Sequence, residues 1–152
     1  MDTGRRNAFA RLFAVAAASV AAWRPWSGPA RAAETDASRV AYHLSDVDRV
    51  LFVLGNIENH IEGMGGPQNV HIELVVHGPA LVLFEKAKAS PDVTRRLAKA
   101  AANVVALAAC GNTMKAQNLE IADLLPGFVR VDEGGVVRLA RLQAEGYAYL
   151  RP

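Results

Sequence analysis

The sequence of 152 residues contains a single cysteine, Cys110. One thiol cannot form a disulfide within its own chain, and this excludes a self-contained dithiol oxidoreductase. If Cys110 takes part in chemistry, it must act as a nucleophile, a persulfide carrier, a metal ligand or a link to another chain. The setting of this residue is therefore the first question that the sequence raises.

The apolar run near the N-terminus is too short to cross a bilayer as a helix. Residues 12–22 supply eleven apolar and small residues after Arg11, whereas a spanning helix needs about 20. A small-x-small cleavage site follows at residues 30–32. This pattern predicts a cleavable export signal over residues 1–33 and a periplasmic or secreted mature protein without a stable membrane span. A disordered, Ala/Arg-rich N-terminus on a cytosolic protein is the alternative.

The export route stays open. Arg5 and Arg6, followed by Phe9, resemble a twin-arginine motif, although the apolar residue stands one place later than usual. Both the twin-arginine and the general secretory route remain alternatives.

Basic charge is scarce outside this segment. The formal net charge of +2 arises from residues 1–33, which hold five arginines and one acid. Residues 34–152 contain 12 basic and 14 acidic residues and have no cationic run, so we expect no nucleic-acid partner. Their length suits a single domain with one core, and no internal repeat is visible.

Strands and helices alternate along residues 34–152. The predicted strands are 39–44, 70–76, 104–109, 128–132 and 147–151. Helices are predicted from a capping box at Ser45 and Asp48, over 80–86, after the N-cap Ser90, from Asn112, and after residues 134–135. Helical spacing predicts these inward-facing side chains: Val47, Val50, Leu51, Leu54, Ile57, Ile61, Leu97, Ala98, Ala101, Val136, Leu139 and Leu142.

This alternation predicts the fold class. Five strands joined by helices favour a three-layer α/β/α sandwich with a flavodoxin-like, mostly parallel five-stranded sheet. The crossovers favour an order in which the first strand lies between the second and the third. In such sheets, ligands bind beyond the carboxyl ends of the strands.

Three reactive side chains lie at those strand ends. His43, His77 and Cys110 close the first three strands, and neighbouring strands are about 4.8 Å apart, so we expect the three to share one cleft. Each also has a structural alternative: His43 can fill a half-buried position, His77 can belong to a turn, and Cys110 can be an inert buried thiol. His60 and His71 are expected at the core edge or in solvent.

The residues around Cys110 predict an activated thiol. An apolar strand delivers it to the first turn of a helix that begins with Gly111, Asn112 and Thr113, where free amides favour the thiolate. We expect the amides and side chains of Asn112 and Thr113 to stabilise a bound anion. Lys115 either adds positive potential or, as the simpler expectation, remains solvated.

Four segments resemble the DsrE/DsrF-like family. They are VVHGPA at 75–80, ACGNTM at 109–114, LLPG at 124–127 and LQAEGYAY at 142–149, and the resemblance extends from about Arg39 to the C-terminus. It implies a small α/β domain that forms homotrimers or homohexamers. In several members it also implies sulfur relay through a cysteine persulfide, and Cys110 matches the strand-end cysteine. The export signal is a departure from the cytoplasmic relay members.

The resulting prediction is a sulfur carrier or sulfurtransferase-type protein that holds sulfane sulfur on Cys110. His77 is expected to assist proton transfer, and His43, Gly78, Gly111, Asn112 and Thr113 to contribute to binding. The expected partners are a sulfur donor or acceptor protein or a small sulfane-sulfur compound, and no cofactor is expected.

Two other classes stay open. One is a non-catalytic oligomeric protein for small-ligand binding or assembly, in which Cys110 is structural. The other is a copper or zinc site formed by His43, His77 and Cys110. A nucleotide or flavin site is disfavoured because acids at Asp46 and Asp48 follow the first strand, where a Gly-rich phosphate loop would be needed.

Overall fold

Five short apolar segments pair as one parallel sheet. The computed structural model describes residues 37–152, and the predicted export signal lies outside them. The strands are β1 (Ser38–Leu44), β2 (Val70–Val76), β3 (Ala106–Cys110), β4 (Phe128–Val131) and β5 (Ala148–Leu150), in the order β4-β3-β2-β1-β5. Every pairing is parallel, which confirms the predicted sheet and α/β class.

The predicted strand order is wrong. β1 lies between β2 and β5, not between β2 and β3. The chain steps from β1 to β4 in one direction, with its helical crossovers on one face, and then returns to the free edge of β1. Because parallel crossovers are right-handed, the return connection must pass over the opposite face. This return places the C-terminal strand beside β1.

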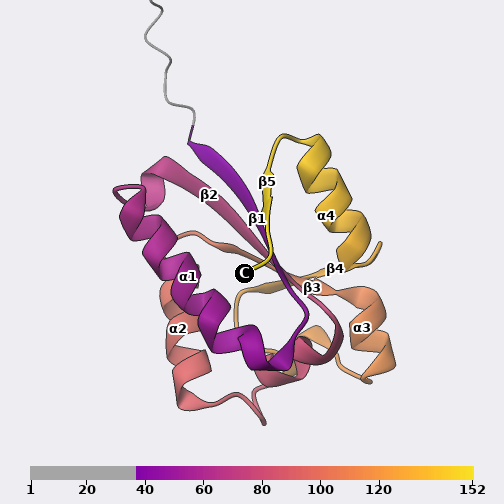
Figure 1. The fold of residues 1–152 in the computed structure, drawn as a ribbon. Coiled ribbons are helices and arrows are strands. Elements are labelled where there is room, and N and C mark those ends of the chain that lie inside the picture. The colour runs from indigo at the N-terminus through magenta and orange to yellow at the C-terminus, as the bar shows by residue number, and fades with distance from the viewer. Residues whose placement is uncertain (1–36) are drawn as a thin grey trace, which may run out of the picture. The chain divides into compact units, whose positions relative to one another are not determined.

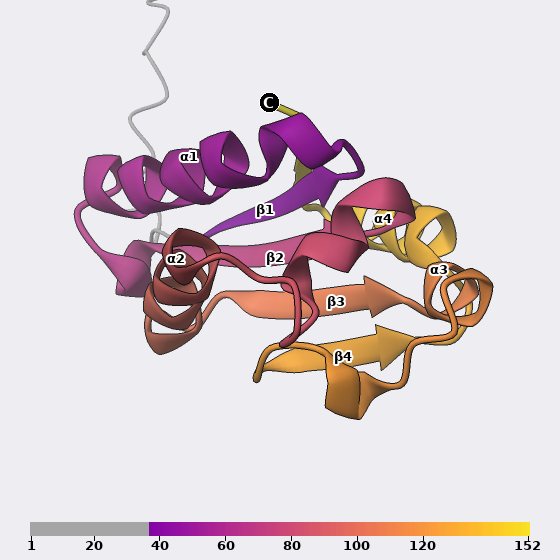
Figure 2. The same cartoon turned by 90° about the horizontal axis from the view of Figure 1, so that it is seen from below.

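Helices cover the two faces unequally, as Figures 1 and 2 show. On one face lie α1 (Val50–Gly63), α2 (Pro91–Ala102) and the 3-10 helix η3 (Gly78–Phe84), while α4 (Gly135–Ala144) covers the other. The short α3 (Gly111–Ala116) lies beyond the arrowheads of β3 and β4 in Figure 2. Three further 3-10 helices are η1 (Val47–Arg49), η2 (Pro67–Asn69) and η4 (Ile121–Asp123).

Strand alternation divides the buried side chains between the two faces. The larger core, under α1, α2 and η3, includes Leu44, Leu74 and Leu107. The smaller core places Ala41, Val75 and Ala108 against Leu139 and Leu142 of α4. Successive side chains of a strand point to opposite faces, so the residue two places after each of these three small or branched residues also points toward α4. Those residues are His43, His77 and Cys110.

The way in which a helix begins determines which of its side chains face the core, and so which of the predicted inward positions are buried. Ser90 caps α2 as predicted, its Oγ accepting the Val93 N–H at 3.3 Å. Ser45 is not a cap, because the chain enters α1 through η1 with Asp46 before it. A 3-10 turn has three residues instead of 3.6, which rotates the helix face and leaves Val47 and Leu51 each 45% exposed.

The other burial corrections concern α2 and α4. In α2, Ala98 and Ala101 are exposed, and Val93, Leu97 and Ala100 form the buried stripe. Val136, in the first turn of α4, is 69% exposed, whereas Leu139 and Leu142 are buried as predicted. Between residues 37 and 152, none of the helices is both long and apolar enough to span a bilayer.

Candidate functional site

Cys110 lies where the chain leaves β3 and enters α3. Its side chain is 6% exposed, and it accepts hydrogen bonds from the Thr113 hydroxyl and from the amides of Gly135, Thr113 and Asn112. Burial raises the pKa of the thiol, but these hydrogen bonds together outweigh burial and hold the pKa below its usual value. The local structure therefore favours an anion on this sulfur.

Two glycines let the start of α4 approach this sulfur. A Cβ on Gly135 would lie 3.3 Å from the Cβ atoms of both Cys110 and His77. Gly134 has a φ of +94°, and a Cβ there would lie 2.6 Å from the Asn112 side chain. The absence of side chains at this Gly-Gly pair thus allows the backbone to pack directly against the site. The sequence predicted only that a helix begins after these two residues.

The predicted binding glycines hold the frame of the pocket. Gly111 is packed against β4, where a Cβ would lie 2.9 Å from the Val131 carbonyl oxygen. The Gly78 N–H donates to Thr113 Oγ1 at 2.9 Å, and its carbonyl accepts from Gln117 Nε2 at 3.0 Å. These bonds tie the start of η3 to α3, and so connect the end of β2 to the end of β3.

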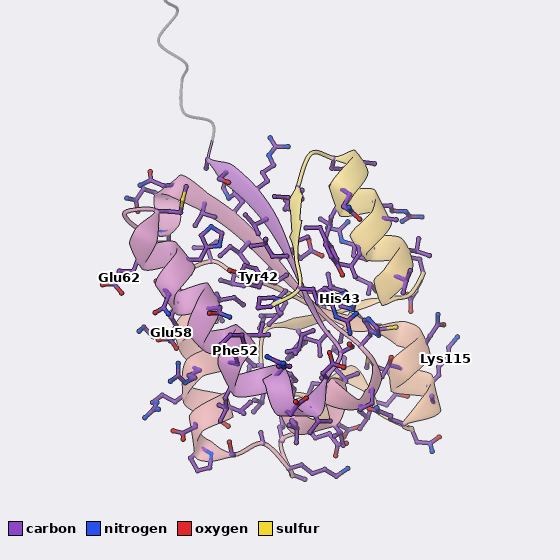
Figure 3. The ribbon with its side chains drawn as sticks, in the orientation of Figure 1. Tyr42, His43, Phe52, Glu58, Glu62 and Lys115 are labelled. Carbon is purple, nitrogen blue, oxygen red and sulfur yellow. The ribbon has the colours of Figure 1, made fainter. Side chains whose placement is uncertain are left out.

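The two predicted histidines are in direct contact. His43 Nε2 and His77 Nε2 are 2.5 Å apart, and the two rings meet edge to edge, with centroids 4.6 Å apart and planes 25° apart. On its other side, His43 Nδ1 lies 2.5 Å from the Tyr149 hydroxyl. Figure 3 shows His43 at the carboxyl end of β1 and Lys115 far out on α3. Lys115 is exposed, in agreement with the prediction that it remains solvated.

His77 and Cys110 share a pocket of about 240 Å³. Its wall also includes Asn112, Glu133 and the first residues of α4. The three predicted side chains thus meet at one sheet edge, but the shared cleft holds only two of them: His77 and Cys110 line the pocket, whereas His43 contacts His77 from outside it.

Both histidines are held in the neutral form. Burial, then the proximity of His77 and of Arg151, lowers the pKa of His43 to about 4, against a smaller opposing effect of Asp46. Burial and the Arg151 charge also lower the pKa of His77. Arg151 is itself fixed at the outer side, where it donates to Ser45 Oγ at 3.1 Å and to Asp46 Oδ2 at 3.0 Å.

A sequence model of the DsrE/DsrF-like family matches residues 30–152. The chain belongs to the DsrE/DsrF-like family. Among solved structures, it is similar to the protein of unknown function MTH1491 from Methanobacterium thermoautotrophicum, with 29% identity, a TM-score of 0.67, and coverage of 76% of this chain and 99% of that one.

Two further structures share the fold. The ychN protein from E. coli and the conserved protein of unknown function BT1422 from Bacteroides thetaiotaomicron each have 14% identity, a TM-score of 0.59 and coverage of 76% of this chain. The match covers 99% of ychN and 95% of BT1422. The comparison with curated proteins gave no match.

In this DsrE/DsrF-like domain, sequence reasoning missed the outer members of the site. Tyr149 was visible only as part of the family-like segment 142–149, and Arg151 and Asp46 received no role. The proximity of Tyr149 and Arg151 to His43 depends on β5 pairing with β1, which the predicted strand order did not include. A C-terminal strand ending in Tyr-Leu-Arg was the only signal in the sequence.

The remaining two histidines lie where the sequence predicts. His60 is half-buried and pairs with the Tyr42 hydroxyl at 2.9 Å, and His71 is exposed, as predicted for core-edge and solvent positions. Within residues 37–152, no three His, Cys, Asp or Glu side chains are grouped so that they could hold a metal ion. The geometry therefore gives the copper or zinc hypothesis no support.

The depressed histidine pKa values predict acid sensitivity. Unfolded His43 takes up its proton near pH 6.5 and folded His43 only near pH 4, so between these values the unfolded state binds more protons. Stability is thus full above pH 6.5 and is expected to fall as the pH decreases toward 4. Thermal unfolding across this range should show a weaker pH dependence in His43→Gln. Equal dependence in both proteins would contradict the assignment.

Proposed function

We propose that this DsrE/DsrF-like protein is a sulfur carrier that accepts sulfane sulfur on Cys110 and holds it as a persulfide. The observation that carries the proposal is the set of hydrogen bonds on Cys110 from the Thr113 hydroxyl and from three backbone amides. Such an arrangement stabilises a thiolate, which is the form of cysteine that attacks sulfur. The same donors suit the negative charge of a persulfide.

Loading needs no external oxidant or reductant. The Cys110 thiolate attacks the sulfane sulfur of a polysulfide or a persulfide, a new S–S bond forms, and the S–S bond of the donor breaks. The electron pair of the broken bond leaves with the departing sulfur. Unloading is the reverse reaction with another thiolate as the attacking group, so one cysteine suffices.

The surroundings of the thiol fit this exchange. Cys110 is nearly buried but faces a pocket of about 240 Å³, large enough for a short sulfur chain or a single thiol group. His77 lines the same pocket and is neutral, so it is suited to accept or supply a proton. The sulfur is thus largely shielded from bulk solvent but adjoins a pocket that can admit a reactant.

The proposal also covers the cellular location, the reaction partners and the oligomeric state. The export signal predicted over residues 1–33 supports action in the periplasm or outside the cell, on a small sulfane-sulfur compound or a partner protein thiol. A homotrimer or homohexamer is supported by the family resemblance. Two exposed apolar side chains on the pocket wall, Val136 and Val137, supply surface for such contacts.

Sulfide release tests the proposed function. The purified domain is treated with inorganic polysulfide, desalted and reduced with dithiothreitol, and the released sulfide is measured. We expect about one sulfide per wild-type chain and none above background from Cys110→Ser, which keeps the shape of the side chain but lacks the thiol. Wild-type protein that releases no more sulfide than Cys110→Ser would favour a binding or assembly protein with a structural cysteine.

A further inference from the structure

A row of hydrogen-bonding atoms runs from the surface to the Cys110 pocket. The Tyr149 hydroxyl contacts His43 Nδ1, and His43 Nε2 contacts His77 Nε2, each at 2.5 Å. Tyr149 is 40% exposed at the outer end, and His77 lines the pocket with Cys110 at the inner end. Three titratable groups from β1, β5 and the end of β2 are thus connected without a gap.

The fold fixes the outer end of this row. Strand β5 is only three residues long and pairs with β1 so that Tyr149 lies opposite Ala41. A side chain on one strand reaches the diagonal neighbour two positions along the adjacent strand, which here is His43. The two bonds of Arg151 to Ser45 and Asp46 hold the end of β5 in place.

The hydrogen-bond inventory allows only two arrangements of protons in the neutral row. A neutral imidazole carries one N–H and one bare nitrogen. In the first arrangement, Tyr149 donates to His43, His43 donates to His77, and His77 Nδ1 carries a proton. In the second, His77 donates to His43, His43 donates to Tyr149, and His77 Nδ1 is bare. His77 Nε2 is occupied by His43, so Nδ1 is the nitrogen of His77 that remains to exchange protons with the pocket.

We infer that Tyr149 and His43 form a proton path between solvent and His77, and that the protons of sulfur transfer on Cys110 travel along it. This inference rests on the sulfur-carrier function proposed above. His77 is the group that exchanges protons with the reacting thiols, and His43 and Tyr149 act through it. The charged groups around the path are Asp46 and Arg151 at its outer end and Glu133 on the pocket wall.

The proton balance closes over one cycle. During loading, the departing sulfur of the donor takes the Nδ1 proton of His77, each bond of the row reverses, and Tyr149 gains a proton from water. During unloading, the thiol of the acceptor gives its proton to His77 Nδ1, the row returns to the first arrangement, and Tyr149 releases a proton to water. Neither histidine becomes an imidazolium, and Cys110 begins and ends the cycle as a thiolate.

Tyr149→Phe tests the path, because it removes the hydroxyl and keeps the ring. Polysulfide-loaded protein is mixed with a small thiol, and the rate of sulfur transfer is followed with and without added imidazole. We expect the final extent of loading to be unchanged and transfer to be slower by about tenfold or more. Added imidazole, a soluble proton carrier, should restore much of the rate in the variant and change the wild-type rate little.

Tyr42→Phe is the matched control. It removes a comparable tyrosine–histidine hydrogen bond, that of Tyr42 with His60, outside the path, and it should transfer sulfur at the wild-type rate. Far-UV circular dichroism checks the fold of each variant. If Tyr149→Phe does not fold, His43→Gln replaces it, since an amide preserves hydrogen bonding but cannot relay protons.

The outcomes separate the two proposals. Wild-type protein that loads sulfur, with Tyr149→Phe transferring at the wild-type rate, overturns the proton path and leaves the carrier function intact. Slow transfer that imidazole does not rescue, or that Tyr42→Phe shares, also overturns the path, because a structural defect explains it. Wild-type protein that never loads sulfur overturns both.

Discussion

Replacing Arg138 with leucine is expected to lower the free energy of unfolding by about 3 kcal/mol. Glu73 on β2 is only 7% exposed, and Arg138 of α4 holds both its carboxylate oxygens, through Nε at 2.7 Å and through a second guanidinium nitrogen at 2.6 Å. Without Arg138, this carboxylate remains under α4 with no cation. Urea denaturation of wild type and variant measures the loss.

Two variants show whether burial causes that loss. Arg141 also lies on α4 and forms an exposed ion pair with Glu133. Arg141→Leu removes this pair and should change the free energy of unfolding by about 1 kcal/mol or less. The double variant Glu73→Leu/Arg138→Leu removes both charges and should recover most of the stability. A loss in Arg138→Leu no larger than that in Arg141→Leu would show that the Glu73 pair does not stabilise the α4 face.

Thr113→Val is expected to slow alkylation of Cys110 by about tenfold near neutral pH. The Thr113 hydroxyl donates to the thiol, and a hydrogen bond to a charged group contributes about 1.5 kcal/mol, which corresponds to about tenfold in the thiolate population. The pKa of Cys110 should therefore rise toward its usual value. The rate of reaction with iodoacetamide as a function of pH measures this shift.

The control for this variant is Thr94→Val, which removes a threonine hydroxyl from an exposed turn of α2. It should leave the alkylation profile unchanged. Thr113→Val also removes the acceptor of the Gly78 N–H, so a decrease in stability of about 1–2 kcal/mol should accompany the slower reaction. An alkylation profile identical to wild type would mean that the hydroxyl does not stabilise the thiolate.

The sequence predicts the elements of this fold well because local patterns determine them. The apolar segment 70–76 matches β2, and Ser90 with Pro91 marks the start of α2, because a cap and a fixed proline φ act within one turn. Val47 and Leu51 show the limit of periodicity. Their positions depend on a 3-10 turn before α1, which the apolar spacing does not reveal.

The residues of the candidate site also fall into two groups, those that a local pattern predicts and those that long-range packing brings to the site. His43, His77 and Cys110 follow from strand ends, a property that each segment carries by itself. Tyr149 and Gly135 reach the site only through the return of the chain over the second face, which brings α4 and β5 to it. That return is decided by the packing of the whole sheet, so no local pattern identifies these two residues.

The mass of the intact protein after polysulfide treatment tests the central claim most directly. Excess reagent is removed without reduction, and the mass of wild type is compared with that of Cys110→Ser. The account predicts that wild type gains the mass of one sulfur atom, that dithiothreitol removes it, and that the variant gains none. A wild-type mass that does not change, or an equal gain in Cys110→Ser, would contradict the assignment of Cys110 as a sulfur carrier.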